Sequence, residues 1–376
     1  MKTNICLPHK AIYVVCFICS LFFSRNGKAQ TFEYINSSNK SSEALTLVAG
    51  KDYYFVGGRF EPENWFYSVP YLIKLNIDGD TLFTRSMESS KEGQDQIVSL
   101  VSMKKNRIGI LAETDNMLRI SQQEADGKEV WSYSNKTIEH PVAMVVNTKN
   151  ELIACGSCAS DGYNNGENTV CVVKLDTKGK ADWIIFAGEG ERIKPYGITS
   201  TTSGEIILVV KHRVQKNYEH FLVRISAKGE ILGTISLSKA DLDEVFDIKT
   251  DNSGDMYLTG EGKTQAKPVL VKLNTTGQVV WQQMYEGEPG NYRAYSLAPD
   301  GDRGFVLAGR TREAKGFLIK TDTQGNQQWI KIFSGIDKAG FKKVVVTEDG
   351  YVLAGVTLSG NKNKAYCVKV DRSGDL

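Results

Sequence analysis

The chain has 376 residues, of which 41% are hydrophobic and 24% are charged, a composition that is ordinary for a globular protein with a large core. Four of its 46 basic residues lie in the first 29 positions, so the rest of the chain carries 42 basic against 44 acidic residues. This near-neutral balance argues against nucleic acid or an anionic membrane as the partner. With 35 glycines, eight prolines and many short apolar runs, the sequence favours an all-β fold.

The N-terminal segment is typical of an export signal. A basic start precedes an apolar run over residues 11–23, and Gly27 and Ala29 are the small residues of a cleavage site. The run is shorter than the ~20 residues of a membrane span but fits a signal-peptide core. We therefore predict a signal peptide over residues 1–29 and a mature protein over residues 30–376 that is secreted, periplasmic or on the cell surface. A retained N-terminal anchor is the alternative, and no second span is predicted.

A repeat of about fifty residues runs through the mature chain, as repeat architectures require. Each unit has two short apolar runs, a turn glycine, and in most units a basic residue five positions before that glycine. In four units a Trp follows the glycine by four positions. The turn glycines recur at intervals of 48 to 52 residues: Gly79, Gly127, Gly179, Gly229, Gly277, Gly325 and Gly374. Short β-branched and aromatic runs bounded by turns are strands, and four strands at this period form a propeller blade. The sequence therefore predicts an all-β, seven-bladed β-propeller of four-stranded blades.

The seventh unit ends at Leu376, before its outer strand. Residues 30–36 resemble residues 281–287 of the fifth unit, with Gln30 at the position of Trp281. We predict that this N-terminal strand pairs beside residues 365–370 and completes the last blade, which leaves no open sheet edge.

The blade pattern carries a resemblance to known proteins. Gly-Tyr-Val-Leu-Ala-Gly at residues 350–355 and Lys-x-Asp-x-x-Gly-x-x-x-Trp at residues 320–329 resemble the repeat of exported bacterial seven-bladed propellers over residues 30–376. The Gly-x-x-x-Trp element is more distantly similar to the tryptophan-docking repeats of pyrroloquinoline-quinone dehydrogenases. The chain departs from those quinoproteins in its Asp-to-Gly spacing, its seven units and its lack of an adjacent cysteine pair. The resemblance implies the fold and no particular chemistry.

Candidate binding residues are sought where the repeats differ, because a residue repeated around the ring is typical of packing. The repeated Lys and Trp are therefore interpreted as structural. The connections from second to third strand and from blade to blade vary, and the longest are residues 59–70, 157–168 and 211–219. Their aromatic rings could stack a sugar or grip a peptide, and their arginines could hold a carboxylated or sulfated glycan. Loop aromatics packed on their own blade and solvated surface charge are the alternatives. The candidate ligand-binding residues are Trp65, Tyr67, Arg192, His212, Arg213, Tyr218, Arg310 and Arg312.

Motifs for catalysis, metals or cofactors are absent from the sequence. There is no zinc spacing, nucleophile elbow, P-loop or dinucleotide fingerprint, so no catalytic residue, metal or cofactor is assigned. The oxygen-rich segment 161–168 departs from the EF-hand pattern, and a turn-rich loop is favoured over calcium there. We predict a monomeric binding or scaffold propeller that recognises a glycan or protein on the variable-loop face. The alternative is a carbohydrate-active enzyme, a lyase or glycoside hydrolase at the channel mouth, with His212, Arg213 and Tyr218 as the first residues to consider for a lyase.

Cys158 and Cys171 stand symmetrically about the predicted loop between the second and third strands of the third blade. In an oxidising compartment they are candidates for a cross-strand disulfide. Two free buried thiols are the alternative.

Overall fold

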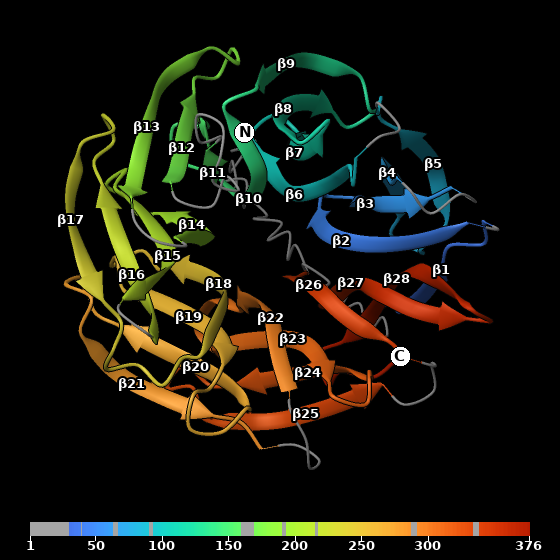
Figure 1. Cartoon of the computed structure of the whole chain (residues 1–376). Helices are drawn as coiled ribbons and strands as arrows, with labels where there is room; N and C mark the ends of the chain where they lie inside the picture. The colour runs from blue at the N-terminus through green and yellow to red at the C-terminus, as the bar shows by residue number, and fades with distance from the viewer. Residues whose placement is uncertain are drawn as a thin grey trace, which may run out of the picture.

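The computed structural model describes residues 30–38, 40–62, 67–89, 93–158, 169–189, 193–214, 217–286, 292–333 and 338–376. These ranges hold 28 strands and one short 3-10 helix, Gly301–Arg303. The strands form seven four-stranded antiparallel sheets, which follow one another around a central axis (Figure 1). The predicted seven-bladed β-propeller is therefore confirmed.

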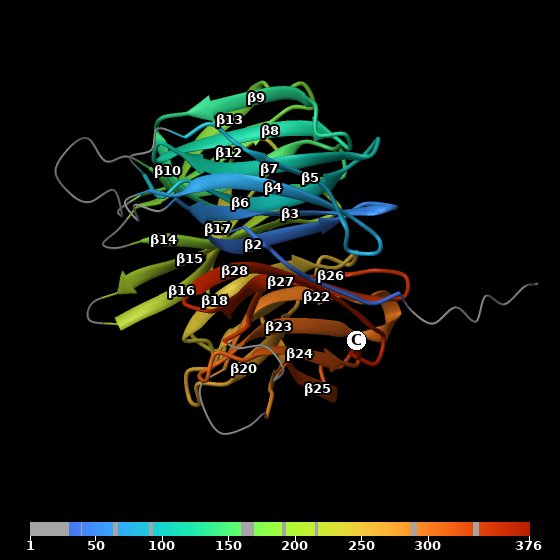
Figure 2. The ribbon, with the colours of Figure 1, turned by 90° about the vertical axis from the view of Figure 1, so that its right-hand side faces the viewer.

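Each blade runs from an inner strand at the axis to an outer strand at the rim (Figures 1 and 2). The first three blades are β2 (Ser41–Ala49), β3 (Tyr53–Glu61), β4 (Val69–Asn76) and β5 (Thr81–Ser86); β6 (Gln96–Met103), β7 (Arg107–Thr114), β8 (Met117–Glu124) and β9 (Glu129–Asn135); and β10 (Ile138–Val146), β11 (Leu152–Cys158), β12 (Thr169–Leu175) and β13 (Ala181–Glu189). The next three are β14 (Lys194–Ser200), β15 (Ile206–Val214), β16 (Asn217–Ile225) and β17 (Ile231–Ser236); β18 (Glu244–Thr250), β19 (Met256–Glu261), β20 (Pro268–Leu273) and β21 (Val279–Met284); and β22 (Tyr292–Pro299), β23 (Phe305–Thr311), β24 (Gly316–Thr321) and β25 (Gln327–Phe333). Blade seven has β26 (Gly340–Val346), β27 (Gly350–Ser359), β28 (Lys362–Asp371) and β1 (Phe32–Ile35).

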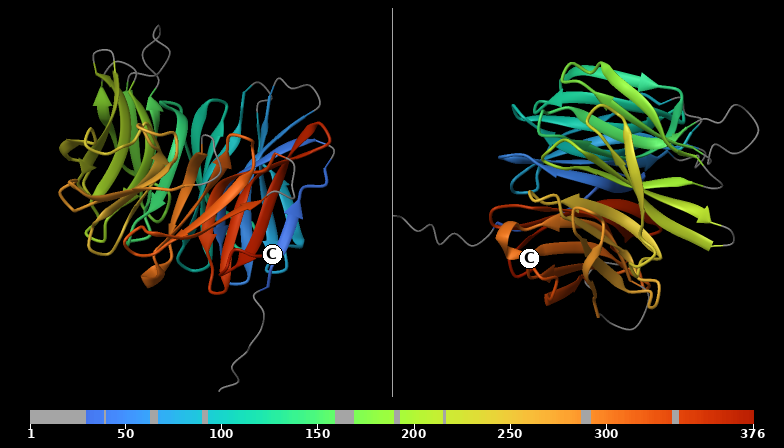
Figure 3. Two further views of the ribbon diagram at one scale, coloured as in Figure 1. Left: turned by 90° about the horizontal axis from the view of Figure 1, so that it is seen from below. Right: turned by 90° about the vertical axis from the view of Figure 1, so that its left-hand side faces the viewer.

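The ring closes through its N-terminal strand, as predicted. β1 pairs with β28 from Phe32 opposite Lys369 to Ile35 opposite Tyr366, and the two strands lie side by side in Figure 3. In blade five Trp281 stands opposite the repeated Lys272, so Phe32 occupies the Trp position in blade seven. The predicted alignment of Gln30 with that position is wrong by two residues.

An outer-strand aromatic residue joins each blade to the next, except that Ile235 takes this role between blades four and five. A Cβ atom built on Gly179 would lie 2.4 Å from Trp131 of the preceding blade, and one on Gly325 would lie 2.7 Å from Trp281. Phe32 covers Gly79 in the same way, with a corresponding distance of 2.6 Å. These turn glycines have positive φ, which suits glycine. The outer-strand Trp side chains are only half-buried, so they act as inter-blade covers and not as members of the core.

The hydrophobic core is divided among the interfaces between neighbouring blades. Seven clusters of buried apolar side chains occur in the described part of the chain, and each combines residues of two adjacent blades. Because no cluster belongs to one blade alone, a blade cannot bury its apolar surface without both neighbours.

Every inner strand has a β-bulge at the same register. The extra residue is partly exposed although it lies on the innermost strand, so it faces the central axis. These seven residues, called the axial ring below, are Leu45, Val98, Val142, Tyr196, Phe246, Tyr295 and Lys342.

Candidate functional site

Two of the predicted site residues, Trp65 and Arg192, lie outside the described residues, as does the segment 161–168. Tyr67 is half-buried just before β4, and Arg310 and Arg312 are exposed at the end of β23 and just after it. The structure therefore locates Arg310 and Arg312 on the variable face, at the connection from second to third strand.

The predicted loop over residues 211–219 is largely a hairpin extension of β15 and β16 (Figure 2). Arg213 pairs with Tyr218, and His212 pairs with Glu219. Since side chains alternate along a strand, His212 and Arg213 project from opposite faces of the sheet. The loop prediction is wrong because these charged residues continue the strand pairing, and the three residues considered for a lyase do not converge.

The mouth of the ring on the variable face carries charged side chains from neighbouring blades. They come from the residue pairs just outside the inner-strand bulges, such as Glu43 opposite Arg59 and Glu244 opposite Glu261. Ion pairs cross between blades here: Lys211 to Glu244 at 2.6 Å and Arg293 to Glu261 at 2.8 Å. These pairs link blades four, five and six around the mouth.

Blade six has two cations at these positions. Arg293 and Arg310 stand directly opposite each other in β22 and β23, and like charges so placed repel. Arg293 is paired with Glu261, whereas no acidic partner of Arg310 occurs among the residues the structure describes. The next blade has Gly340 at the matching position of β26. A Cβ atom on Gly340 would lie 2.9 Å from the Cδ atom of Arg310, so the arginine side chain crosses over that glycine.

Lys342 of the axial ring supplies a second cation beside Arg310. Its Nζ atom lies 3.9 Å from the ring centroid of Tyr295, a cation–π contact, and the described ranges contain no ion-pair partner for it. Burial lowers the pKa of Lys342; Arg310, Arg293 and Arg59 lower it further, and Glu43 opposes them. Glu43 is itself engaged by Arg59 at 3.1 Å. Positive charge thus exceeds negative charge where blades six, seven and one meet.

The axial ring is chemically two-sided. Blades one to three contribute aliphatic side chains, whereas blades four to six contribute Tyr196, Phe246 and Tyr295. Phe246 and Tyr295 meet edge to face with centroids 4.9 Å apart, a favourable arrangement for aromatic pairs. The half-buried rings of Phe246 and Tyr295, called the aromatic arc below, lie next to Lys342, whereas Tyr196 packs against His220.

Asp247 fastens three blades together deeper along the axis. From β18 it forms ion pairs with Lys249 of the same strand and, at 3.5 Å, with Lys343 of β26. It also accepts the backbone N–H of Leu297 at 3.0 Å from β22. Burial acts to raise the pKa of Asp247, but Lys249, Lys343 and the hydrogen bonds together outweigh it and lower the pKa to about 2. This cluster is fully paired and therefore has a structural role.

His220 of β16 is buried between blades four and five. It is 4% exposed, its ring lies edge to face with Tyr196 at 5.5 Å, and Nε2 has no hydrogen-bond partner in the described ranges. Burial lowers the pKa of His220 to about 4, with Lys211 adding to the decrease and Asp243 opposing it. The imidazole is therefore neutral at physiological pH.

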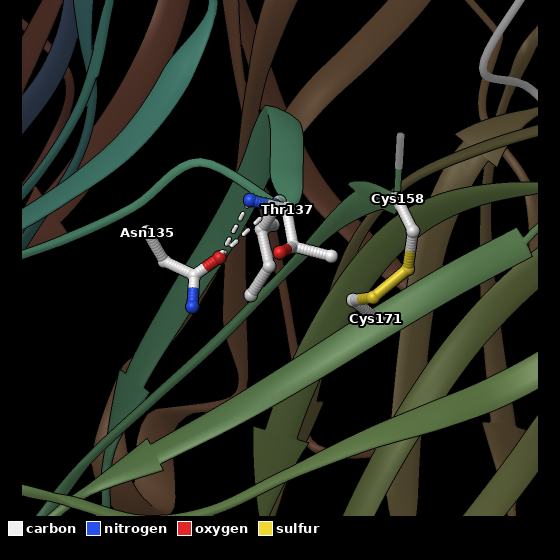
Figure 4. The surroundings of a disulfide bond; sticks show 5 residues. Asn135, Thr137, Cys158 and Cys171 are labelled. Carbon is white, nitrogen blue, oxygen red and sulfur yellow. Dashed lines mark hydrogen bonds between the residues drawn. A yellow bond between two sulfur atoms is a disulfide. The ribbon is translucent and has the colours of Figure 1, made fainter. Parts of the chain in front are cut away.

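The structure joins Cys158 and Cys171 in a disulfide, with Cα atoms 5.6 Å apart (Figure 4). Cys158 lies at the end of β11, where it stands opposite Ile138 of β10, and Cys171 lies in β12. Both residues are buried. The remaining described cysteines, Cys155 and Cys367, are buried thiols.

Within the described ranges, no group of three or more His, Cys, Asp or Glu could hold a metal ion. The same part of the chain contains no helix with the length and hydrophobicity that crossing a bilayer requires.

Comparisons with solved structures confirm the propeller fold. A protein of unknown function from Bacteroides caccae is 15% identical with a TM-score of 0.50, over 78% of this chain and 94% of its own. Sqt1 from Chaetomium thermophilum is 13% identical with a TM-score of 0.55, over 93% of this chain and 85% of its own. Drosophila Plexin A, in complex with Semaphorin 1b, is 8% identical with a TM-score of 0.54, over 92% of this chain and 88% of its own.

Sequence comparison adds little to this result. No family model matches the chain. The outer-membrane lipoprotein carrier protein of Methylococcus capsulatus is 27% identical over 124 residues, which are 32% of this chain. The chain spans 60% of the length of that curated relative.

Sequence reasoning selected Arg310 but missed the axial residues beside it, Tyr295 and Lys342. A usable signal existed, because the inner strands can be aligned with one another. At the bulge position, Leu and Val in the first three units give way to aromatic residues and then to Lys in the last four.

Proposed function

We propose that this protein is an exported binding or scaffold propeller that recognises a glycan or a protein at the mouth on its variable face. One observation carries the proposal: Arg310 and Lys342 form an unbalanced basic corner beside the aromatic arc. Recognition needs a position that differs from its counterparts around the ring, and this corner has no equivalent in the other described blades.

The packing elsewhere supports this assignment. The repeated basic residues pair with outer-strand aromatics, as Lys320 does with Trp329, and the Asp247 cluster is internally satisfied. The mouth is the place where charges are left available to a ligand. Plexin A, a neighbour in fold, is in complex with a protein, Semaphorin 1b, which agrees with a binding role. Export is supported by the predicted signal peptide and by the disulfide, since such bonds persist in oxidising compartments.

The test is a binding screen against immobilised glycans and secreted proteins, followed by location of the site with two variants. Tyr295→Ala alters the mouth, whereas Leu82→Ala alters the outer strand β5, where Leu82 is 54% exposed. We expect the mouth variant to weaken binding at least tenfold and the outer-strand variant to bind like the wild type. A ligand lost equally in both variants, or in neither, would place recognition away from the mouth.

A further inference from the structure

The basic corner differs from the rest of the mouth in how its charges are compensated. Lys211 has Glu244, Arg293 has Glu261 and Arg59 has Glu43. Arg310 and Lys342 have no such carboxylate among the residues that the structure describes. At the site where a compensating acid would stand, the chain has Gly340, opposite Val356.

Both cations are held in place without being neutralised. The Arg310 side chain crosses over Gly340, whose missing side chain leaves it this path. Lys342 rests on the face of Tyr295, and Phe246 supports Tyr295 from the edge. The Arg310 contact with Gly340 uses the stem of the side chain, so the guanidinium donors stay available. The Lys342 ammonium touches the Tyr295 face on one side, and no carboxylate among the described residues pairs with it. A preorganised pair of cations binds an anion at a lower entropy cost.

We infer that Arg310 and Lys342 form an anion site at the mouth between blades six and seven, and that it takes the carboxylate or sulfate group of an acidic oligosaccharide. The inference rests on the proposed binding function and names its ligand class. A guanidinium suits the two oxygens of such a group, and an ammonium adds a second charge-assisted hydrogen bond.

An acidic sugar is favoured over an acidic protein segment by the surroundings of the site. Protein interfaces centre on buried apolar and aromatic contacts. Most of the exposed large apolar side chains in the described ranges lie on outer strands, away from the mouth: Leu82, Val130, Ile184, Phe186, Ile231, Leu232 and Val280. At the mouth, planar polar groups such as Gln96, His140 and Asn363 lie beside carboxylates, an arrangement that suits the hydroxyl groups of sugars.

The test is calorimetric titration of the full mature chain with oligogalacturonate, with the same oligosaccharide after reduction of its carboxyl groups, with dextran sulfate fragments and with an oligoglutamate peptide. Arg310→Gln and Lys342→Met remove the two cations. Lys228→Met is the matched control, because Lys228 is an exposed lysine in the turn between β16 and β17, on the face opposite the mouth. Thermal melting shows whether each variant is folded, and Arg310→Gln changes only an exposed side chain.

We expect an acidic oligosaccharide to bind, the carboxylate form at least tenfold more tightly than the reduced form. Arg310→Gln and Lys342→Met should each weaken it at least tenfold, and Lys228→Met less than twofold. Preference for dextran sulfate with the same dependence would also support the site and would identify the anion as sulfate. Equal binding by wild type and both variants would overturn it, as would binding of oligoglutamate alone. If acidic sugars fail while a neutral glycan or a protein binds and depends on Tyr295, the inference fails but the proposed function stands.

Discussion

Acidification should destabilise this propeller through one buried histidine. The folded state holds His220 neutral, with a pKa of about 4, against an ordinary value of 6.5. As the pH falls below 6.5, the unfolded chain therefore takes up a proton that the folded chain refuses. The contribution of His220 to stability is complete above about pH 6.5, declines between pH 6.5 and pH 4, and is fully lost below that window.

The size of the effect follows from the difference in pKa. Because each pKa unit corresponds to about 1.4 kcal/mol, the difference between the folded and unfolded pKa of His220 lowers the free energy of unfolding by about 3 kcal/mol at acidic pH. The groups that face the imidazole are Lys211, which disfavours protonation, and Asp243, which favours it. Since His220 is 4% exposed, solvent screening reduces this value little.

The assay is urea unfolding at pH 7.5, 6, 5 and 4 for the wild type and for His220→Phe. The variant keeps a ring against Tyr196 but cannot be protonated. Carboxylates titrate in the same range in both proteins, so the difference between the two stability curves isolates His220. We expect the wild type to lose about 3 kcal/mol more than the variant between pH 7.5 and pH 4. Parallel curves would refute a buried neutral imidazole at this position.

Three further predictions concern the ring itself. Phe32→Ala should lower the free energy of unfolding in urea by about 3–5 kcal/mol, because Phe32 is 8% exposed and closes the ring. The control Leu82→Ala should change it by no more than about 0.5 kcal/mol, and equal losses would contradict closure of the ring through Phe32. Asp247→Asn should lower the free energy of unfolding by about 2–3 kcal/mol, near the lower limit for a broken buried ion pair, because its two lysines are partly exposed. An unchanged midpoint of urea unfolding would show that the cluster does not stabilise the ring. Replacing Cys158 and Cys171 together by Ser should cost about 3 kcal/mol for a sequence separation of 13 residues, and mass spectrometry of the wild type should find no free thiol at either position.

The blade architecture could be predicted from the sequence because it depends on short-range features that recur. The turn glycines need positive φ, and in the first six units each is followed by a residue that covers the next blade, as Trp131 covers Gly179. Such features survive in sequence as fixed spacings. The sequence places the covering residue of β1 two positions before Phe32, because β1 follows no turn glycine of its own and only packing on Gly79 defines its register.

The mouth could not be assembled from the sequence because its residues come from separate blades. Arg310 comes from the second strand of blade six, Lys342 from the inner strand of blade seven, and Glu261, which pairs with Arg293, from blade five. The inner-strand bulges add a second difficulty, since one extra residue reverses which side chains face the axis. The hairpin of β15 and β16 was predicted as a loop because charged residues such as Lys211 and Arg213 are uncommon in buried strands.

The basic corner of the mouth is the part of the molecule where we expect the ligand to bind. The direct measurement is a crystal structure of the mature protein with the tightest-binding oligosaccharide from the titrations. We predict a carboxylate or sulfate group within hydrogen-bond distance of the Arg310 guanidinium and the Lys342 ammonium, with its sugar beside Tyr295. A ligand bound on the opposite face, or on the outer strands with the corner empty, would contradict the claim.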